Sequence, residues 1–252
     1  MLPEQISVSQ ITSYLLCPRK YAFRYVYGYE PERKAVALAF GTSIHAALAW
    51  FNQQKMAGQE INPEILVSIF EADWEASLAE PLDFESLDEP RELLDLGRSL
   101  LPQFADRMKN VRPVAIEERF EVPLVDPETG QTLSPVPLVG VIDCRSADTL
   151  YEYKTAARQI SGDDLKRHLQ LSAYSYARRL QGDPPQRLCL VSLLKQKQPS
   201  VRVSLTERSV AEEAWFCRLA SEVVEAIDAS AFPPSPGWMC SGCEHTARCQ
   251  QT

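Results

Sequence analysis

The sequence predicts an α/β protein built from amphipathic helices and short strands. Several segments repeat apolar residues at helical spacing, while others alternate or run continuously apolar in the manner of strands. A length of 252 residues with 45% apolar residues suits one large or two small globular domains. The start of the chain lacks a signal peptide and no apolar run is long enough to span a membrane, so we expect a soluble cytoplasmic protein.

The first predicted element is a helix that Ser7 or Ser9 can cap. It ends at Cys17-Pro18, because proline disfavours helical geometry in the residue before it. A second helical stretch, 19–27, mixes aromatic residues with Arg and Lys. Such a mixture can stack on bases and pair with phosphates, but it fits a core with a charged rim equally well.

The next helix is expected to begin at Thr42 or Ser43, either of which can serve as N-cap. Its apolar stripe is formed by Ile44, Leu48 and Phe51. His45 lies in the first turn, beside this stripe. A single histidine at such a position is more often structural than a ligand.

Two further amphipathic helices are predicted at 62–78 and 89–109. The stretch between them, 80–90, is acidic and interrupted by proline. We interpret residues 58–110 as a helical insertion or cap.

Strands follow from residue 114 onward. A strand at 114–124 and a turn at 126–130 lead into a return strand that ends at Asp143. Either Glu117 or Glu118 on the first strand can point toward Asp143.

The rest of the chain predicts one long helix at 161–180, strands at 187–194 and 200–205, and a last helix at 207–229. A polar stripe at helical spacing runs along the first of these helices through Lys166, Gln170 and Tyr174.

Residues 138–155 are the central stretch of the sequence. Their pattern predicts two strands that carry Asp143, Glu152 and Lys154. Glu152 and Lys154 share one face of the second strand, and pairing of the strands as a hairpin brings Asp143 to it. Two carboxylates can hold a hard divalent cation such as Mg²⁺, and the ammonium can orient a water or stabilise charge on a phosphate. The alternative is a solvated charged face.

A net charge of −8 argues against wholesale attraction to nucleic acid but allows a local basic track. Candidate residues near the start are Arg19, Lys20, Arg24, Arg33 and Lys34. Those after the acidic stretch are Arg158, Lys166, Arg167, Arg178 and Arg179. Both groups fit solvated helix faces as well.

Seven cysteines divide into two groups. Three occupy apolar or mixed segments, where a free cysteine usually acts as a small core residue: Cys144, Cys189 and Cys217. The others are Cys17 and the C-x2-C-x5-C set of Cys240, Cys243 and Cys249. Four thiolates suit a structural Zn²⁺ or an iron–sulfur cluster. His245 is a possible substitute ligand, so zinc stays an alternative to iron.

The order of these motifs resembles the RecB-like branch of the PD-(D/E)XK nuclease superfamily, in particular its iron–sulfur members, the CRISPR-associated RecB-like exonucleases and the AddB-type nuclease domains. The motifs run through nearly the whole chain: Cys17-Pro-Arg-Lys-Tyr, Gly41-Thr-Ser-Ile-His45, Gly140-Val-Ile-Asp143, Glu152-Tyr-Lys154, Gln170-Leu-Ser-Ala-Tyr174 and the three C-terminal cysteines. The acidic helical segment is outside this set.

The resemblance implies a restriction-endonuclease-like fold, a central mixed sheet flanked by helices, with the N-terminal helices and C-terminal tail joined by a metal cluster. It implies one nuclease domain over 1–252, with the insertion at about 58–110 and cluster-binding segments at 14–24 and 238–252.

The resemblance also implies roles for single residues. Mg²⁺ or Mn²⁺ would be held by His45, Asp143, Glu152 and the backbone carbonyl of Tyr153. Lys154 would orient or activate the attacking water, and Gln170 with Tyr174 would position the lysine region and DNA. A 4Fe–4S cluster would be held by Cys17, Cys240, Cys243 and Cys249.

Two functional hypotheses follow. The first is a metal-dependent DNA exonuclease that acts on single-stranded ends in DNA repair or CRISPR adaptation, with DNA contacts from Arg19, Lys20, Arg24, Arg158 and Lys166. The second is a DNA-binding or assembly module with a nuclease fold, active mainly within a helicase or integrase complex.

Overall fold

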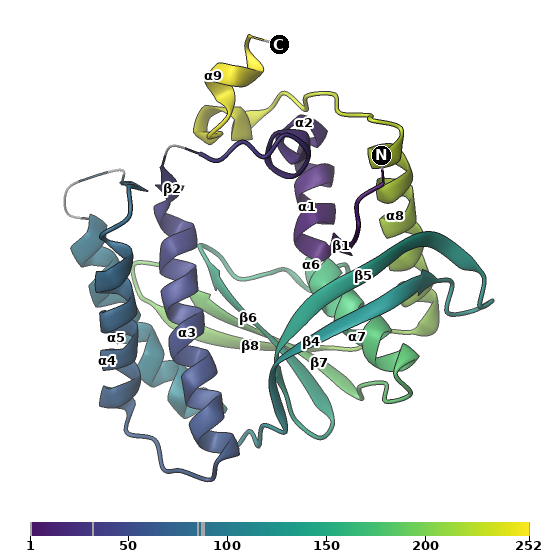
Figure 1. Ribbon diagram of the computed structural model, residues 1–252. Coiled ribbons are helices and arrows are strands. Elements are labelled where there is room, and N and C mark those ends of the chain that lie inside the picture. Colours follow the sequence, from purple (N-terminus) through teal and green to yellow (C-terminus); the bar gives the residue numbers. More distant parts are fainter. Residues whose placement is uncertain (1, 32, 85, 87–88, 252) are drawn as a thin grey trace.

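The computed structural model describes residues 2–31, 33–84, 86 and 89–251 (Figure 1). Within that part of the chain, the strands of the main sheet are β1 (Ile6–Ser7), β4 (Ala115–Val125), β5 (Thr132–Arg145), β6 (Thr149–Ala156), β7 (Arg187–Leu194) and β8 (Ser200–Thr206). Their order is β1-β5-β6-β7-β8, and β4 pairs with β5. The sheet is mixed, because β1/β5 and β6/β7 are parallel pairs and the others are antiparallel.

The longest strand of the sheet, β5, pairs with β4 along most of its length and also with β1 and β6. Gly140 on β5 faces Phe120 on β4, and an added Cβ at 140 would lie 2.5 Å from the ring. Glycine therefore lets the aromatic ring lie flat across the neighbouring strand. This packing keeps β4 and β5 closely paired just before β5 reaches Asp143.

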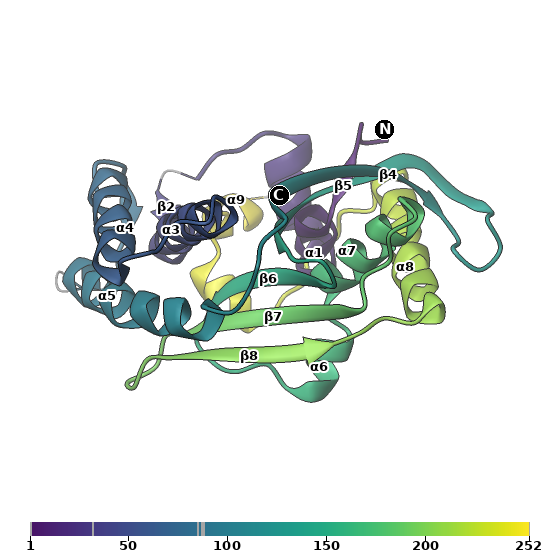
Figure 2. The ribbon, with the colours of Figure 1, turned by 90° about the horizontal axis from the view of Figure 1, so that it is seen from below.

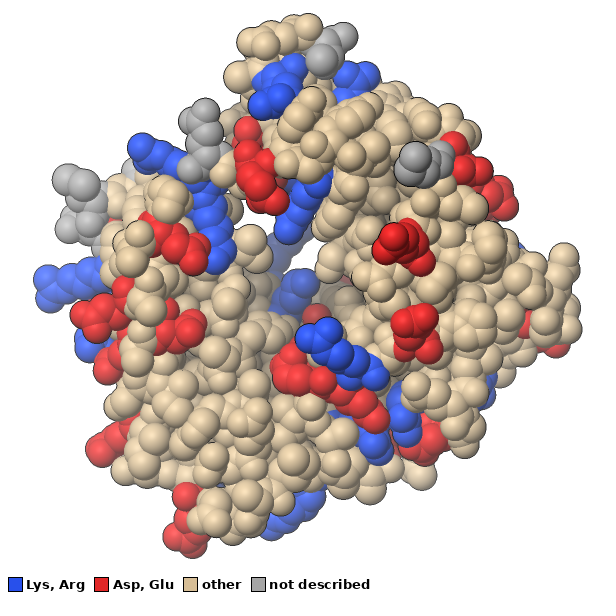
Figure 3. Space-filling model, viewed as in Figure 1, with Lys and Arg blue, Asp and Glu red and all other residues tan. Residues whose placement is uncertain are grey.

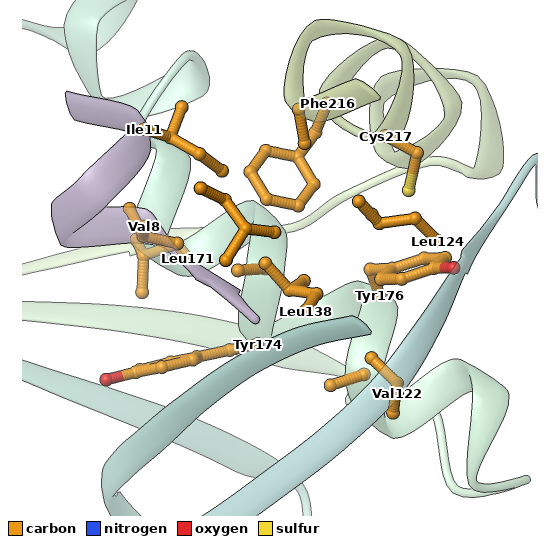
Figure 4. Packing of buried hydrophobic residues seen from close by; sticks show 14 of the residues in the cluster. Val8, Ile11, Val122, Leu124, Leu138, Leu171, Tyr174, Tyr176, Phe216 and Cys217 are labelled. Carbon is orange, nitrogen blue, oxygen red and sulfur yellow. The ribbon is translucent and has the colours of Figure 1, made fainter. Parts of the chain in front are cut away.

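Three helices cover one face of the sheet: α1 (Val8–Leu16), α7 (Leu169–Leu180) and α8 (Val210–Asp228). Their apolar stripes and the facing strand residues form one buried cluster, shown in Figure 4, that includes Ile11, Leu138, Leu171 and Phe216. Of the two predicted N-caps, Ser7 and Ser9, Ser7 begins α1, and it forms a capping box with Gln10.

The opposite face is covered by α3 (Val36–Met56), α4 (Pro63–Ser77) and α5 (Glu89–Met108), which Figure 2 shows gathered on one side of the strands. A short parallel bridge joins β2 (Lys34–Ala35) to β3 (Leu82–Asp83) beside them. The Phe104 ring of α5 packs edge-on against both Phe51 of α3 and Tyr153 of β6. Residues 58–110, interpreted from the sequence as an insertion, thus form part of a second buried cluster, which packs against β6 on this face of the sheet.

The prediction that Thr42 or Ser43 begins a helix is wrong. Helix α3 begins at Val36, and its N-cap, Ala35, has no side-chain capping bond. The Thr42 hydroxyl donates to the Leu38 carbonyl within the helix. His45 consequently lies in the interior of α3 instead of its first turn.

The prediction of one helix at 161–180 is also wrong, because the structure has α6 (Gly162–Lys166) and α7 separated at Arg167 and His168. The buried Arg208 guanidinium donates to the Leu165 carbonyl at 2.8 Å. It also donates to the Ser172 hydroxyl at 2.8 Å. These bonds tie both helices to one guanidinium and stabilise the break between them, so Lys166 does not continue the stripe of Gln170 and Tyr174.

The C-terminal tail packs on the segment that follows α1. That segment contains α2 (Pro18–Tyr21) and the π-helical η1 (Ala22–Val26), and the tail contains η2 (Trp238–Gly242) and α9 (Thr246–Cys249). The Tyr14 hydroxyl donates to the Ala231 carbonyl at 2.6 Å, and the Lys20 ammonium pairs with Glu244 at 2.9 Å. The segment after α1 and the C-terminal tail therefore meet above the sheet (Figure 1).

None of the helices in the described ranges is both long and apolar enough to cross a membrane.

Candidate active site

Asp143 and Glu152 lie where β5 and β6 separate. The ladder between these strands ends at the pair of Cys144 and Tyr151. Beyond it the Asp143 side chain enters the gap, and its Oδ2 accepts a hydrogen bond from the Tyr153 backbone N–H at 2.7 Å. The carboxylate takes the place of a strand partner, which fixes it against β6 beside Glu152.

Glu152 is 7% exposed and is held by Tyr174. The Tyr174 hydroxyl lies 2.7 Å from Glu152 Oε2 and 2.5 Å from the Val141 carbonyl oxygen. A phenol carries one proton and can donate to only one of these oxygens, so a protonated Glu152 would complete the network by donating to the phenol. Figure 4 shows this hydroxyl directed away from the apolar cluster that holds the ring.

Burial makes both carboxyls poor acids. Removal from water is the largest cause that raises the pKa of Asp143 and the pKa of Glu152. The charge of Glu117 raises the pKa of Asp143 further, while the Tyr153 N–H and the Lys154 ammonium lower it. Asp143 likewise raises the pKa of Glu152. The pair holds a proton more readily than exposed carboxyls do.

Two cationic or potentially cationic groups stand beside the pair. His45 Nδ1 lies 3.8 Å from Asp143 Oδ1, and its imidazole is 37% exposed. Lys154 is exposed at the end of the same strand face, as the alternation of β6 predicts. The structure therefore brings His45, Asp143, Glu152 and Lys154 to one place.

The alternative of Glu117 or Glu118 is resolved in favour of Glu117. Its charge acts on both His45 and Asp143, and its backbone has a φ of +49°, a left-handed conformation that is uncommon for this residue. Glu118 points elsewhere and pairs with Arg145 at 2.8 Å and Arg178 at 3.4 Å. Nothing in the spacing distinguishes the two, because the backbone departs from regular strand geometry at residue 117.

The donor set fits a hard cation, although no three His, Cys, Asp or Glu side chains in the described ranges meet as a ready metal site. Two buried carboxylates and a backbone carbonyl are oxygen ligands of the kind that Mg²⁺ and Mn²⁺ prefer. A divalent cation would also offset the cost of ionising Asp143 and Glu152 together.

These carboxylates open into a cleft of about 670 Å³. Gln170 and Tyr174 of α7 form one wall, and Ser7 and Ser9 at the start of α1 form another. Arg119 of β4 also lines the cleft. The participation of Arg119 and of the start of α1 could not be predicted, because neither belongs to the motifs that carry Asp143 and Glu152.

His168 is a further residue that the motifs do not include. It lies at the N-cap of α7, two residues before Gln170, and its Nδ1 is a buried atom without a hydrogen-bond partner within the described residues. Burial and the charges of Lys154 and Arg208 lower the pKa of His168 to about 4. A neutral imidazole therefore faces the charge of Lys154.

The candidate DNA-contacting residues do not form one track. Arg158, between β6 and α6, and Lys166, at the end of α6, are both exposed. Arg19, Lys20 and Arg24 lie at the tail, where Lys20 is paired with Glu244. Of the wider basic groups, Arg178 pairs with Glu118 and Asp183, and Arg179 with the fully buried Glu213, so these two stabilise the fold.

The cysteines meet the expectations in part. Cys144, Cys189 and Cys217 are buried as predicted. The other four lie around the contact between α2 and the tail, where the Cys17 sulfur accepts a bond from the Ser235 N–H at 3.5 Å and the Cys240 sulfur one from the Gly237 N–H at 3.4 Å. They are not drawn together as a metal site in the described structure. His245 is buried against the Phe23 ring, with the centroids 5.3 Å apart.

Comparison with known proteins places this arrangement in a family. A model of the PD-(D/E)XK nuclease superfamily matches residues 5–250. No curated protein sequence matches the chain.

Among solved structures, a protein from Eubacterium rectale described as a "putative exonuclease" superposes with a TM-score of 0.58 at 11% identity, over 96% of this chain and 88% of that one. At this identity the likeness concerns the fold alone. The structure of SSO0001 gives a TM-score of 0.37 at 14% identity over 94% and 95% of the two chains, too low to carry an argument. The mixed sheet, the acidic pair where its strands separate and a family model that spans 5–250 agree: the chain belongs to the PD-(D/E)XK nuclease superfamily.

Proposed function

We propose that the protein is a metal-dependent DNA exonuclease that hydrolyses phosphodiester bonds at single-stranded ends. The observation that carries the proposal is the pair of buried carboxyls, Asp143 and Glu152, which line an open cleft and lie within reach of the charge of Lys154. A burial that raises the pKa of two adjacent carboxyls is costly and is typical of functional sites.

The proposed ligands of Mg²⁺ or Mn²⁺ are Asp143, Glu152, the Tyr153 carbonyl and His45. When bound, the cation would activate a water and neutralise charge that develops on the phosphate. The chain's own residues perform the remaining tasks. The Tyr153 N–H and the Tyr174 hydroxyl fix the two carboxylates. The Lys154 ammonium orients the water, and Gln170, on the cleft wall, positions the strand.

The shape of the molecule supports a single strand as substrate. Figure 3 shows it deeply hollowed at its centre, between the regions of α3 and α1 in Figure 1, with Lys and Arg side chains on the walls. A hollow enclosed on both sides admits a single strand more readily than a duplex, and basic walls attract its phosphates.

We further propose that the chain is one nuclease domain of the RecB-like branch, with the insertion at about 58–110. Cys17, Cys240, Cys243 and Cys249 would hold a 4Fe–4S cluster or, as an alternative, zinc. The contacts of Lys20 with Glu244 and of Phe23 with His245 support this proposal, since they bring segments 14–24 and 238–252 together.

Elemental analysis of protein purified without oxygen tests the cluster. We expect about four iron atoms per chain and their loss in Cys240→Ser, since each iron needs one of the four thiolates. One zinc atom per chain would favour the alternative, and neither metal would rule out both.

A module that works mainly within a helicase or integrase complex is the second candidate. The net charge of −8 favours it, because an acidic protein gains from a partner that supplies affinity for DNA.

The test compares Lys154→Ala with wild type for cleavage and for DNA binding, with Glu222→Gln on the exposed side of α8 as control. We expect Lys154→Ala to lose cleavage while it binds DNA within about threefold of wild type, because one surface cation contributes little to affinity. If Lys154→Ala still cleaves DNA, the exonuclease proposal is wrong. If wild type and both variants cleave nothing in the absence of a partner, the result favours the module.

A further inference from the structure

A second cavity, of about 740 Å³, lies between the segment that follows α1 and the C-terminal tail. We name it the tail pocket. Its chemically distinctive lining residues are Arg19, Phe23, Tyr27, Tyr29, Phe232 and Arg248. It shares no lining residue with the cleft at Asp143.

The tail pocket presents aromatic faces. Tyr27 is 52% exposed. Its ring centroid lies 5.7 Å from that of Tyr29 and 6.3 Å from that of Phe23, in tilted arrangements. Phe23 is buried beneath them, and it fixes the two tyrosines in place. A ring with a fixed orientation and an open face loses little entropy when a planar ligand stacks on it.

The cations of the pocket are arginines held in place. The Arg248 guanidinium lies over the Tyr29 ring at 3.8 Å from its centroid. The Arg19 Nε donates to the Phe232 carbonyl at 2.9 Å. The guanidinium of Arg248 is a planar fork of N–H donors of the kind that binds phosphate.

The charge of the pocket departs from that of the molecule. The chain carries a net charge of −8, yet none of the described residues that line the tail pocket is Asp or Glu. Figure 3 likewise shows Lys and Arg side chains on the tail near α9. A pocket with positive charge and aromatic faces is complementary to a ligand that has phosphates and flat rings.

Helix α1 connects this pocket to the cleft. Ser7, Val8 and Ser9 at its start line the cleft, and Arg19 lies just beyond its end at Leu16. The helix has nine residues and is therefore about 14 Å long, the length of a few nucleotides. A strand bound in the cleft can run along α1 to the tail pocket.

We propose that the tail pocket binds a base of the single-stranded DNA substrate, a few nucleotides away from the bond at the acidic centre. The base stacks on Tyr27, and the Arg248 guanidinium binds an adjacent phosphate. Bases expose their faces only in single strands, so the pocket selects an unpaired strand. This inference rests on the proposed function, since it takes DNA as the substrate.

The test uses binding of a fluorescent oligothymidylate, followed by anisotropy in the presence of a metal chelator, and an abasic strand of equal length. Wild type is expected to bind the abasic strand about 10-fold more weakly, and Tyr27→Ala to bind both strands with that lower affinity. A 10-fold change corresponds to about 1.4 kcal/mol, within the range for stacking of one base. Tyr27→Phe, which keeps the aromatic face, should bind as wild type does.

Trp238→Ala is the matched control, because Trp238 is an aromatic residue of the tail that is 86% exposed and does not line the pocket. It should leave both affinities unchanged. Equal affinity of wild type for the intact and abasic strands, or an intact-strand affinity that Tyr27→Ala does not change, would overturn the inference. A preference for duplex over single strand would overturn it as well.

Cleavage of a dinucleotide separates this inference from the proposed function. A dinucleotide is too short to reach from the cleft to the tail pocket, so Tyr27→Ala should cut it at the wild-type rate while KM for long strands rises about 10-fold. If wild type cuts nothing but its binding depends on the bases and on Tyr27, the nuclease proposal fails and the stacking site stands.

Discussion

Asp143 and Glu152 are buried, and burial disfavours the ionised carboxylates that would bind a metal ion. Burial raises the pKa of each carboxyl, so the folded chain keeps protons that the unfolded chain releases above a pH of about 4. Stability from this source is complete below that pH and is lost as the pH rises toward and through the raised folded-state pKa values. In the metal-free protein, ionisation of Asp143 and Glu152 therefore lowers the stability of the fold at neutral and alkaline pH.

Glu152→Gln should therefore raise the unfolding temperature of the metal-free protein at pH 8. Glutamine removes the buried charge, and its amide N–H can donate to the Tyr174 oxygen while the phenol donates to the Val141 carbonyl. A gain of about 1 kcal/mol corresponds to roughly 2–4 °C for a chain of this size. Scanning calorimetry at pH 8 and pH 4 checks it: the gain should vanish at pH 4, and a loss at pH 8 would contradict the account.

Metal binding should depend on pH for the same reason. Ligation needs both carboxylates ionised, and protons compete more strongly as the pH falls. The apparent affinity for Mn²⁺ should drop by about tenfold per pH unit and per proton below neutrality. Titration calorimetry at pH 6 and pH 8 measures it, and proton uptake by the buffer gives the number of protons released. An affinity that does not change with pH would show that the ion binds elsewhere.

At the scale of elements, α5 supports the acidic strand from behind. Phe104 is fully buried, and its ring packs against Tyr153, the residue between Glu152 and Lys154. Phe104→Ala should destabilise the fold by about 3–5 kcal/mol through the cavity it leaves. Ile65→Ala, on an exposed position of α4, is the control and should change stability by less than about 0.5 kcal/mol. Urea unfolding curves give both values, and a small effect of Phe104→Ala would mean that the segment is peripheral.

The elements also show where a sequence is sufficient. The spacing predicts β6, β7 and the capped start of α1, because these depend on local alternation and on the Ser7 cap. The spacing does not predict the break at His168. We attribute the break to Arg208, which is distant in the sequence and donates to the Leu165 carbonyl at the end of α6. The spacing places the start of α3 too late, because Ala35 offers no capping side chain and Thr42 offers a misleading one.

At the scale of the molecule, the sheet brings together what the motifs predict. Asp143, Glu152 and Lys154 lie on adjacent strands, so alternation and one turn suffice to predict their proximity. His45 joins them from a helix on the other side of a long insertion, and only the resemblance to a family indicates it. Arg119 carries no local signal. The mixture of aromatic and basic residues at 19–27 indicates a possible stacking surface, but the pocket around Tyr27 depends on how the distant tail packs.

The central claim is that this acidic strand is the centre of a nuclease. The most direct test is the Mn²⁺-dependent degradation of single-stranded DNA that carries a label at one end, with wild type beside Glu152→Gln and both purified without oxygen. We predict that wild type releases the label or shortens the strand and that Glu152→Gln does neither, although both bind the strand. Equal degradation by the two proteins, or none by a folded wild type loaded with Mn²⁺, would contradict the claim.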